Sequence, residues 1–390
     1  MKYIKSIVSI TALTTLTMVF FLGLVLLLGC QARAVEIGGN INIDYYLNDI
    51  GEDVNTIWQG EAQLEFYIPS GNELTPRFVL QTGVTAGQTY TEVKYLYLRR
   101  SLENGRLTVG RQPISWAYGS VINPLDYGFT VEGLAGEDIT PGVDGVRYSH
   151  SLGAGRRLEL ALDYPDNVTG FLREDTPGGV EPDSLGAGFR LRLPAPGYDL
   201  SLNAVTRKTT ALMSEQRLSR GGLTFKTDVG DYGVYGAAAY YHLSPEPYED
   251  VDDIVLQLGV DTSFFVGEFS QQRVLVQGEY LRFLNQELSP GVLAAFSDEM
   301  AGEDAYGDEG IGGLLSASDL LILNVNYERD MFSSLGLSLM AETEENNVAL
   351  LPYYSDDLGG GFEYRVQGNI LRDKDDQITL GTGVGLTYYF

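Results

Sequence analysis

Apolar and polar residues alternate along most of this chain, and its last fourteen residues, Gln377 to Phe390, show the pattern most clearly. There Ile378, Leu380, Val384 and Leu386 alternate with small or polar residues. A period of two is that of a β-strand, in which successive side chains point to opposite faces. A half-apolar strand needs a partner for its backbone and an apolar medium for one face. A closed barrel in a lipid bilayer supplies both.

The same alternation predicts further strands upstream. In residues 58–68, Trp58 and Leu64 share one face, whereas Glu61 and Glu65 share the other. In a lipid-embedded barrel the apolar set faces outward and the polar set lines the lumen. Seventeen strands are predicted, at 37–47, 58–68, 77–85, 92–97, 107–110, 146–150, 158–164, 185–192, 198–206, 218–227, 232–243, 252–265, 272–284, 319–329, 335–343, 357–367 and 377–390.

An odd count does not suit a barrel of this kind, because bacterial single-chain barrels have an even number of strands. A further strand at about Asn347 to Tyr354 restores an even count, although Pro352 weakens that assignment because proline cannot donate a ladder hydrogen bond. We therefore predict an all-β, closed antiparallel transmembrane β-barrel of 18 strands, with 16 as the alternative. No separate linker is visible, so residues 35–390 are predicted to form one barrel domain.

The alternation breaks after Gly110. A regular ladder would place Arg111 on the lipid side, which costs roughly 2–4 kcal/mol at the bilayer midplane. The strand is therefore expected to bulge or end at Gly110. The stretch that follows, 112–142, lacks strand periodicity and is too long for a hairpin. A loop of this length is usually functional or disordered.

Two segments resemble known families. The terminal strand, with Tyr388 and Phe390, resembles the C-terminal signal strand of bacterial outer-membrane barrels, which implies recognition by the barrel-assembly machinery. The run Gly110-Arg111-Gln112, then Trp116, then Asn123-Pro124-Leu125-Asp126, is similar to a segment of a loose group of porin-like outer-membrane proteins. The chain differs from that group at Ala117, where Gly is expected.

The porin resemblance implies that residues 112–142 fold into the lumen and narrow it, held to the wall by Arg111 and Asp126. The alternative is a structural corner with Trp116 at the membrane interface. The resemblance also implies a bacterial outer-membrane location, with lipid and small hydrophilic solutes as partners. Porins are often trimers, so a homotrimer is an open alternative.

The N-terminus reads as a cleaved signal peptide of residues 1–34. Lys2 and Lys5 precede an apolar run, and Ala32-Arg33-Ala34 forms an A-x-A cleavage site. Leu28-Gly29-Cys30 is a rival, since it resembles a lipoprotein cleavage box and would leave Cys30 lipidated. An uncleaved anchor helix is a third alternative. Cys30 is the single cysteine, so the mature chain has no disulfide or thiolate metal site.

The charge balance is strongly acidic, with 53 acidic and 26 basic residues and a formal net charge of −27. Nucleic acid is therefore excluded as a partner. The balance fits either a repulsive, solvated exterior or a pore that attracts cations. Composition alone favours the solvated exterior.

Catalytic chemistry finds little support. The two histidines are His150 and His242, and Ser149 cannot easily pair with His150 because neighbours in a strand point to opposite faces. The acids within 298–309 lack the residue order of a dedicated calcium loop. We predict no enzyme activity, no cofactor and no metal site.

The predicted function is that of an outer-membrane porin-like channel for passive diffusion of small hydrophilic solutes, preferring cations or neutral solutes. The alternatives are a non-conducting structural or adhesion barrel with acidic extracellular loops, and an outer-membrane hydrolase. The residues predicted to line the pore or its constriction are Glu61, Glu65, Arg77, Glu92, Lys94, Arg111, Gln112, Asp126, Asp163, Arg190, Arg192, Asp261, Glu279, Glu363 and Arg365.

Overall fold

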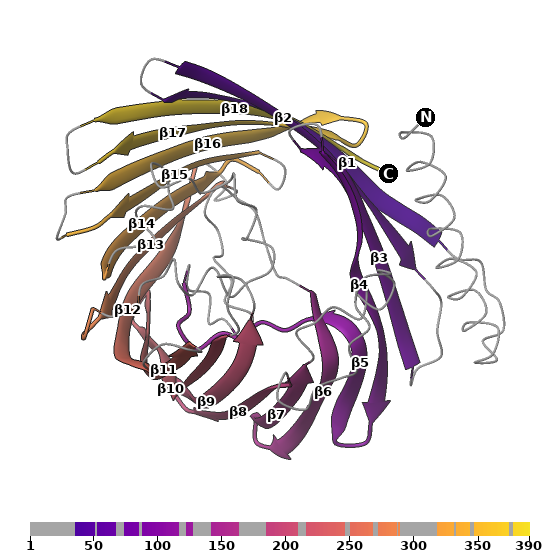
Figure 1. Ribbon diagram of the computed structural model, residues 1–390, viewed down its shortest axis with the longest axis vertical. Helices are drawn as coiled ribbons and strands as arrows, with labels where there is room; N and C mark the ends of the chain where they lie inside the picture. The colour runs from indigo at the N-terminus through magenta and orange to yellow at the C-terminus, as the bar shows by residue number, and fades with distance from the viewer. Residues whose placement is uncertain are drawn as a thin grey trace.

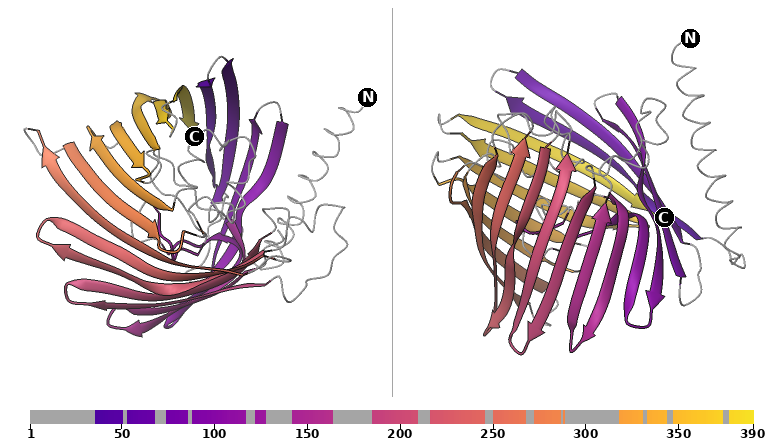
Figure 2. Two further views of the ribbon diagram at one scale, coloured as in Figure 1. Left: turned by 60° about the vertical axis from the view of Figure 1, so that its left-hand side comes forward. Right: turned by 60° about the horizontal axis from the view of Figure 1, so that its bottom comes forward.

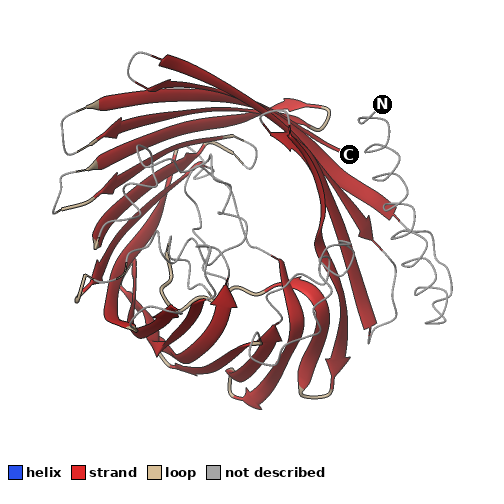
Figure 3. Cartoon of the chain, in the orientation of Figure 1, coloured by secondary structure: helices blue, strands red, loops and turns tan. Residues whose placement is uncertain are grey.

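The computed structural model of the chain is a single closed ring of strands (Figure 1). All of its regular elements are strands in the part that the structure describes (Figure 3). Among those residues, no helix has the length and apolar composition needed to cross a membrane. The structure describes residues 36–50, 53–67, 74–85, 88–116, 122–127, 142–163, 185–209, 216–245, 250–267, 272–286, 288, 318–330, 333–343, 347–373 and 377–390.

The strands follow one another around the ring in chain order, and each pairs antiparallel with the next. The predicted all-β barrel of 18 strands is therefore confirmed. The strands are β1 Glu36–Ile50, β2 Asp53–Tyr67, β3 Leu74–Thr85, β4 Gln88–Leu102, β5 Gly105–Pro113, β6 Gly142–Gly153, β7 Arg156–Asp163, β8 Gly186–Ala195, β9 Tyr198–Thr209, β10 Gln216–Val229, β11 Tyr232–Pro245, β12 Val251–Val266, β13 Gln272–Phe283, β14 Asp319–Glu328, β15 Ser334–Ala341, β16 Val348–Gly359, β17 Phe362–Arg372 and β18 Ile378–Tyr389.

The ring closes where β18 pairs with β1, in a register that places Tyr388 opposite Ile41 and Leu386 opposite Ile43. The terminal residue takes part, because the backbone N–H of Phe390 donates to the carbonyl of Gly39 at 3.1 Å and the reverse bond is 3.2 Å. This closure leaves no unpaired strand edge, as a backbone in hydrocarbon requires.

The two faces of the wall differ in chemistry. Large apolar side chains such as Ile43, Leu162, Leu258 and Val384 are 53–58% exposed on the outer face. The side chains between them point into the lumen and are mostly polar, as in β7, where the inward residues Glu159, Ala161 and Asp163 are buried. Such an outer surface is stable in lipid rather than in water. Figure 2 shows the strands inclined across the wall.

The additional strand predicted near residues 347–354 is present as β16, and it contains Pro352. Pro352 pairs with Leu337 of β15, but the described ladder with β17 passes from the Leu350 pair to the Tyr353 pair without a pair at Pro352. The missing proline N–H therefore breaks no bond on that side.

One predicted strand boundary is wrong. The alternation predicts one strand over 357–367, but this range spans the turn between β16 and β17. Gly359, Gly360 and Gly361 all have positive φ there, between 68° and 85°. Only glycine adopts this conformation without strain, so the triple glycine reverses the chain.

The expectation for Gly110 is also wrong. Strand β5 continues to Pro113 and pairs with β4 and β6 without a register shift. Gly110 has φ +115°, and Arg111 lies between Leu96 and Asp144 on the two neighbouring strands. Arg111 Nη1 is 3.1 Å from Asp144 Oδ2, and both side chains are at most 10% exposed. This ion pair across two strands offsets the cost of the arginine.

Some predictions lie outside the described residues. They concern the signal peptide at 1–34 with its alternatives at Cys30, the acids within 298–309, and most of the loop from residue 117 to 141.

Gly110 provides a test of this backbone. A Cβ at Gly110 would lie 2.2 Å from the carbonyl oxygen of Leu96, and the positive φ adds strain for any other residue. We expect Gly110→Ala to lower the free energy of unfolding by about 1–3 kcal/mol. Urea unfolding of the barrel in lipid vesicles measures this. The control is Gly221→Ala, where the added Cβ lies at least 3.6 Å from its neighbours; an equal loss there would contradict the expectation.

Candidate functional site

A segment of the chain leaves the wall after β5 and lies inside the barrel (Figure 1). We call residues 113–116 and 122–127, its described parts, the inward segment. Its apolar side chains are fully buried, with Ile114, Trp116, Leu125 and Tyr127 at 0% exposure. They belong to two buried apolar clusters, one with residues of β6, β7 and β9 and the other with residues of β10 to β17. The inward segment is therefore part of the core of the barrel.

Side chains of four consecutive wall strands bind the backbone of the inward segment. Gln257 of β12 donates to the carbonyl of Ile122, and Tyr241 of β11 donates to the carbonyl of Pro124. Glu279 of β13 accepts the N–H of Ile122, with 3.4 Å between the nitrogen and Oε2.

The fourth wall strand is β10, which contributes Arg220. Its guanidinium donates to the carbonyls of Asp126 and Tyr127, the latter at 3.0 Å. The side chain of Arg220 is 6% exposed, so these bonds are made in a dry environment. Hydrogen bonds from a charged group contribute more than neutral ones, and losing them would leave buried carbonyls unsatisfied.

Two polar side chains hold the inward segment in its own shape. The carboxylate of Asp126 accepts the backbone N–H of Trp116 and, at 2.9 Å, that of Tyr127. The amide of Asn123 donates to the carbonyl of Trp116 at 3.0 Å and accepts the N–H of Leu125 at 2.9 Å. These bonds join the two described parts, which are separated by five residues in the sequence.

The two aromatic side chains of the inward segment reach acids of β7, on the other side of β8 and β9 from the strands above. Trp116 Nε1 donates to Glu159 Oε2 at 3.2 Å, and the hydroxyl of Tyr127 donates to Asp163. Asp163 also accepts a hydrogen bond from Arg207 Nε, with 2.9 Å between Nε and Oδ2. Tyr127 belongs to the loop rather than to a strand, and burial followed by the charge of Asp163 raises its pKa, so it remains a donor.

Gly188 of β8 allows these rings to approach the wall. A Cβ on Gly188 would lie 2.3 Å from Tyr127 Cε2 and 2.8 Å from Trp116 Cη2. The two rings meet edge to face, with centroids 5.2 Å apart. The absence of a side chain at Gly188 is thus a packing requirement of the inward segment.

Four of the predicted pore residues, Glu61, Glu65, Arg77 and Glu92, lie together on β2, β3 and β4. Glu61 accepts bonds from Gln81 at 2.7 Å and from Tyr90 at 3.0 Å. Glu65 pairs with Arg77 at 2.8 Å. Lys94 stands at a bulge, where the register with β3 passes from Tyr95 to Val93. Among the described residues, the bonds of these side chains stay within the wall rather than reaching the inward segment.

The other predicted residues divide between the inward segment and more distant parts of the wall. Gln112 is 2% exposed, with its amide nitrogen 3.3 Å from the carbonyl of Gly145. Asp163 and Glu279 contact the inward segment, as described above. The remaining pairs lie elsewhere: Arg190 with Ser201, Arg192 with Asp199, Asp261 with Lys226, Glu363 with Tyr389, and Arg365 with Asp44.

Sequence reasoning missed the wall residues that contact the inward segment most closely, namely Glu159, Arg220, Tyr241 and Gln257. Alternation assigns each of them to the inner face, so the signal for their direction was present. Their partners lie 43 to 135 residues away in the chain, which alternation cannot indicate.

Both histidines lie on the outer face, near the ends of β6 and β11. His150 Nδ1 is 3.0 Å from the hydroxyl of Tyr148, and His242 Nδ1 is 2.8 Å from Asp252 Oδ1. In the described strands, Ser149 pairs opposite Glu159 and His150 opposite Leu158. Ser149 and His150 thus face opposite sides of the wall. Within the described residues, no three His, Cys, Asp or Glu side chains gather as metal ligands would.

Comparison with solved structures shows the same fold. The chain is similar to OccAB4 of Acinetobacter baumannii, with 12% identity, a TM-score of 0.55, and 92% of this chain and 99% of that chain covered. It is similar to OccK11 (OpdR) of Pseudomonas aeruginosa, with 12% identity, a TM-score of 0.54, and coverage of 91% and 96%. It is also similar to a BenF-like porin from Pseudomonas fluorescens Pf-5, with 8% identity, a TM-score of 0.54, and 92% of this chain and 99% of that chain covered.

No family model matches the chain, and no curated protein matches it. The identities to the solved structures are low, so the comparison establishes that the chain has the fold of outer-membrane porins.

Gly188 offers a direct test of the packing of the inward segment. We expect Gly188→Ala to displace Trp116 and Tyr127, because a Cβ has no space there, and to cost about 1–3 kcal/mol as overpacking does. Trp58 is the second tryptophan, so Trp58→Phe leaves Trp116 as the single reporter. Its emission should shift to the red and be quenched faster by acrylamide. Unchanged emission and quenching would contradict the described packing.

Proposed function

We propose that this protein is a passive channel of a bacterial outer membrane that admits small hydrophilic solutes. The supporting observation is the inward segment, which occupies part of a polar lumen and is bound to the wall by side chains of consecutive strands. A segment held in this way narrows the lumen. It therefore acts as a constriction that selects solutes by size.

Charge is distributed unevenly around the lumen, which supports selection by charge as well. Inward cations outnumber inward acids on β6 to β10, whereas the inward charged residues of β1, β2 and β12 are acids. The cations include Arg147, Arg190, Arg207, Arg220 and Lys226, and the acids include Asp44, Glu61, Glu65 and Asp261. Opposed arcs of charge create a field across a pore that orders water and solutes.

We propose that the open path runs beside the acids of β1 and β2, because the inward segment lies against the basic strands and against β11 to β13. Two of the cations on the basic strands, Arg207 and Arg220, contact the inward segment or its partners. Solutes would then meet mainly carboxylates, and the channel would prefer cations or neutral solutes. The net charge of −27 supports the same direction.

We propose the remaining partners on the basis of the fold. The apolar outer face supports insertion into outer-membrane lipid. The terminal strand, with Tyr388 stacked on Phe362 at 4.5 Å and Phe390 paired with Gly39, is proposed to carry the signal for the barrel-assembly machinery. A homotrimer is the proposed assembly, by analogy with porins.

The role of the inward segment is tested by Arg220→Met. This substitution leaves the carbonyls of Asp126 and Tyr127 without their charged donor, at a cost of about 1–3 kcal/mol for each unsatisfied group. The inward segment should loosen, and single-channel conductance in a planar bilayer should become larger and noisier. The control is Arg273→Met, which removes a lumen cation paired with Glu328 instead. Equal effects of the two variants would count against a constriction.

A second pair of variants addresses the contacts of Asp126 and Arg111. The carboxylate of Asp126 binds the backbone of the inward segment, whereas Arg111 pairs with Asp144 of the wall. Both Asp126→Asn and Arg111→Gln are expected to change single-channel conductance. Unchanged current in both variants would remove the proposed constriction.

Ion preference is tested by neutralising acids of β2. We expect Glu61→Gln combined with Glu65→Gln to shift the reversal potential under a salt gradient toward anions, because two lumen carboxylates are lost. The control is Asp252→Asn, which removes a negative charge from the outer face, where the side chain is 52% exposed. It should leave the reversal potential unchanged. A native channel that is already anion-selective would refute the proposed preference.

A further inference from the structure

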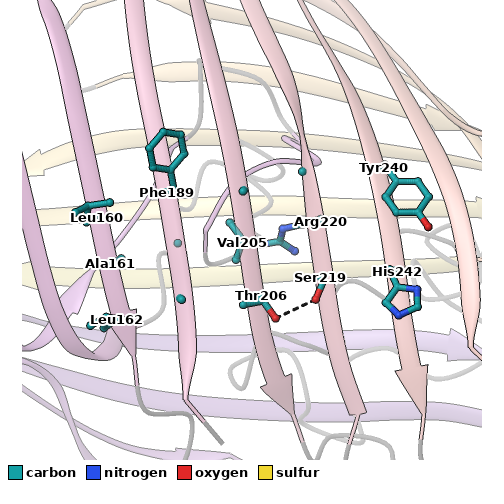
Figure 4. Close-up of a pocket in the computed structure, with 14 residues that line it drawn as sticks. Leu160, Ala161, Leu162, Phe189, Val205, Thr206, Ser219, Arg220, Tyr240 and His242 are labelled. Carbon is teal, nitrogen blue, oxygen red and sulfur yellow. Dashed lines mark hydrogen bonds between the residues drawn. The ribbon is translucent and has the colours of Figure 1, made fainter. Parts of the chain in front are cut away.

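A groove lies on the outer face of the wall, across β7 to β11 (Figure 4). Its volume is about 650 Å³. Leu160, Leu162 and Phe189 form one side, and Tyr240 and His242 form the other. Leu160, Leu162 and Tyr240 are 42–58% exposed, so the groove faces outward, away from the inward segment.

The groove is hollow because its floor is made of small residues. Ala187, Ala204 and Gly221 lie on the floor, together with Thr206 and Ser219. The hydroxyls of Thr206 and Ser219 are 2.9 Å apart and satisfy each other, as the dashed line in Figure 4 shows. In a bilayer a hollow of this size fills with hydrocarbon, since water finds few polar partners there.

Two cations lie on the outer face of the same two strands, one residue pair beyond this hydroxyl pair on that face. Arg217 of β10 pairs in register with Lys208 of β9. Arg217 Nη1 donates to Thr206 Oγ1 at 3.2 Å and to the carbonyl of Leu185 at 3.3 Å. The guanidinium therefore lies on the groove side of the wall, at its polar end.

Acids also lie near this end of the groove, but at its edge. His242 is 2.8 Å from Asp252 Oδ1 and 4.0 Å from Asp250 Oδ2. Both carboxylates are next to the histidine on the far side from Lys208. Two cations therefore lie at the polar end of the groove, and the acids lie to one side of it. This local positive charge contrasts with the net charge of −27 of the chain.

We propose that the groove binds a phosphorylated lipid, with one acyl chain along the floor and the phosphate at Lys208 and Arg217. The cations lie at the end of the barrel where the longest connections between strands occur, such as 164–185 and 284–318. In barrels of this kind that end is extracellular, so the lipid belongs to the outer leaflet. The site is independent of whether the lumen conducts.

The test uses the protein purified from membranes in detergent, with a hexa-acylated, bisphosphorylated lipid A as the probe and phosphatidylcholine as the comparison. Native mass spectrometry measures the lipid retained. The native barrel should retain lipid A at least about tenfold more than phosphatidylcholine. Removing each cation, by Lys208→Gln or Arg217→Gln, should weaken retention about fivefold. Arg372→Gln, on the outward row at the same end of β17, is the matched charge control.

A second variant fills the groove without altering charge. A Cβ at Gly221 lies 3.6 Å or more from its neighbours, so Gly221→Leu should place its side chain in the groove. Gly278→Leu is the matched control, because this outward glycine of β13 also has an open Cβ position, 3.9 Å from Val260. Retention should fall at least tenfold for Gly221→Leu and stay native for Gly278→Leu.

Three outcomes would overturn the proposal. Equal retention of lipid A and phosphatidylcholine would mean that hydrocarbon alone fills the groove. Equal retention by all variants would place the lipid elsewhere. A change in oligomer mass with Gly221→Leu would make the groove a contact between copies of the chain. If Gly221→Leu does not give a heat-modifiable barrel, the lipid preference and the two charge variants decide the question.

Discussion

Every backbone group of a strand in hydrocarbon needs a hydrogen-bond partner within the protein, and this requirement governs the whole molecule. It accounts for the ring of 18 strands and for the pairing of β18 with β1. It also accounts for the participation of the last residue, since Phe390 exchanges backbone bonds with Gly39. The same demand extends inside the lumen. There the backbone of the inward segment has no strand beside it, and wall side chains supply its partners.

Most of the wall could be predicted because its two solvents differ so strongly. Lipid outside and water inside impose a period of two on every strand. The sequence shows this period in residues such as Leu158, Leu160 and Leu162. Even Pro352 was compatible with a strand. The triple glycine at 359–361 was the local signal that should have placed the turn, because three consecutive glycines seldom belong inside a strand.

The site was harder to predict because its contacts connect distant parts of the chain. The lack of strand periodicity in residues 112–142 predicts an unusual loop, and the parts of it that the structure describes between β5 and β6, 114–116 and 122–127, lie inside the barrel. Alternation gave the direction of Arg220 and Gln257 but not their partners, which lie 93 and 135 residues away. Arg111 illustrates the same difficulty. A single strand pattern makes it costly, and only the fold reveals Asp144 beside it.

The wall binds the inward segment mainly through the carbonyls of Ile122, Pro124, Asp126 and Tyr127. Every amino acid has such a carbonyl, so these attachments do not depend on which residues occupy the segment. Mutation could therefore change other side chains of the loop while these attachments stay in place. A barrel built in this way can acquire a new permeability through drift in a few loop codons, with its scaffold and its insertion unchanged.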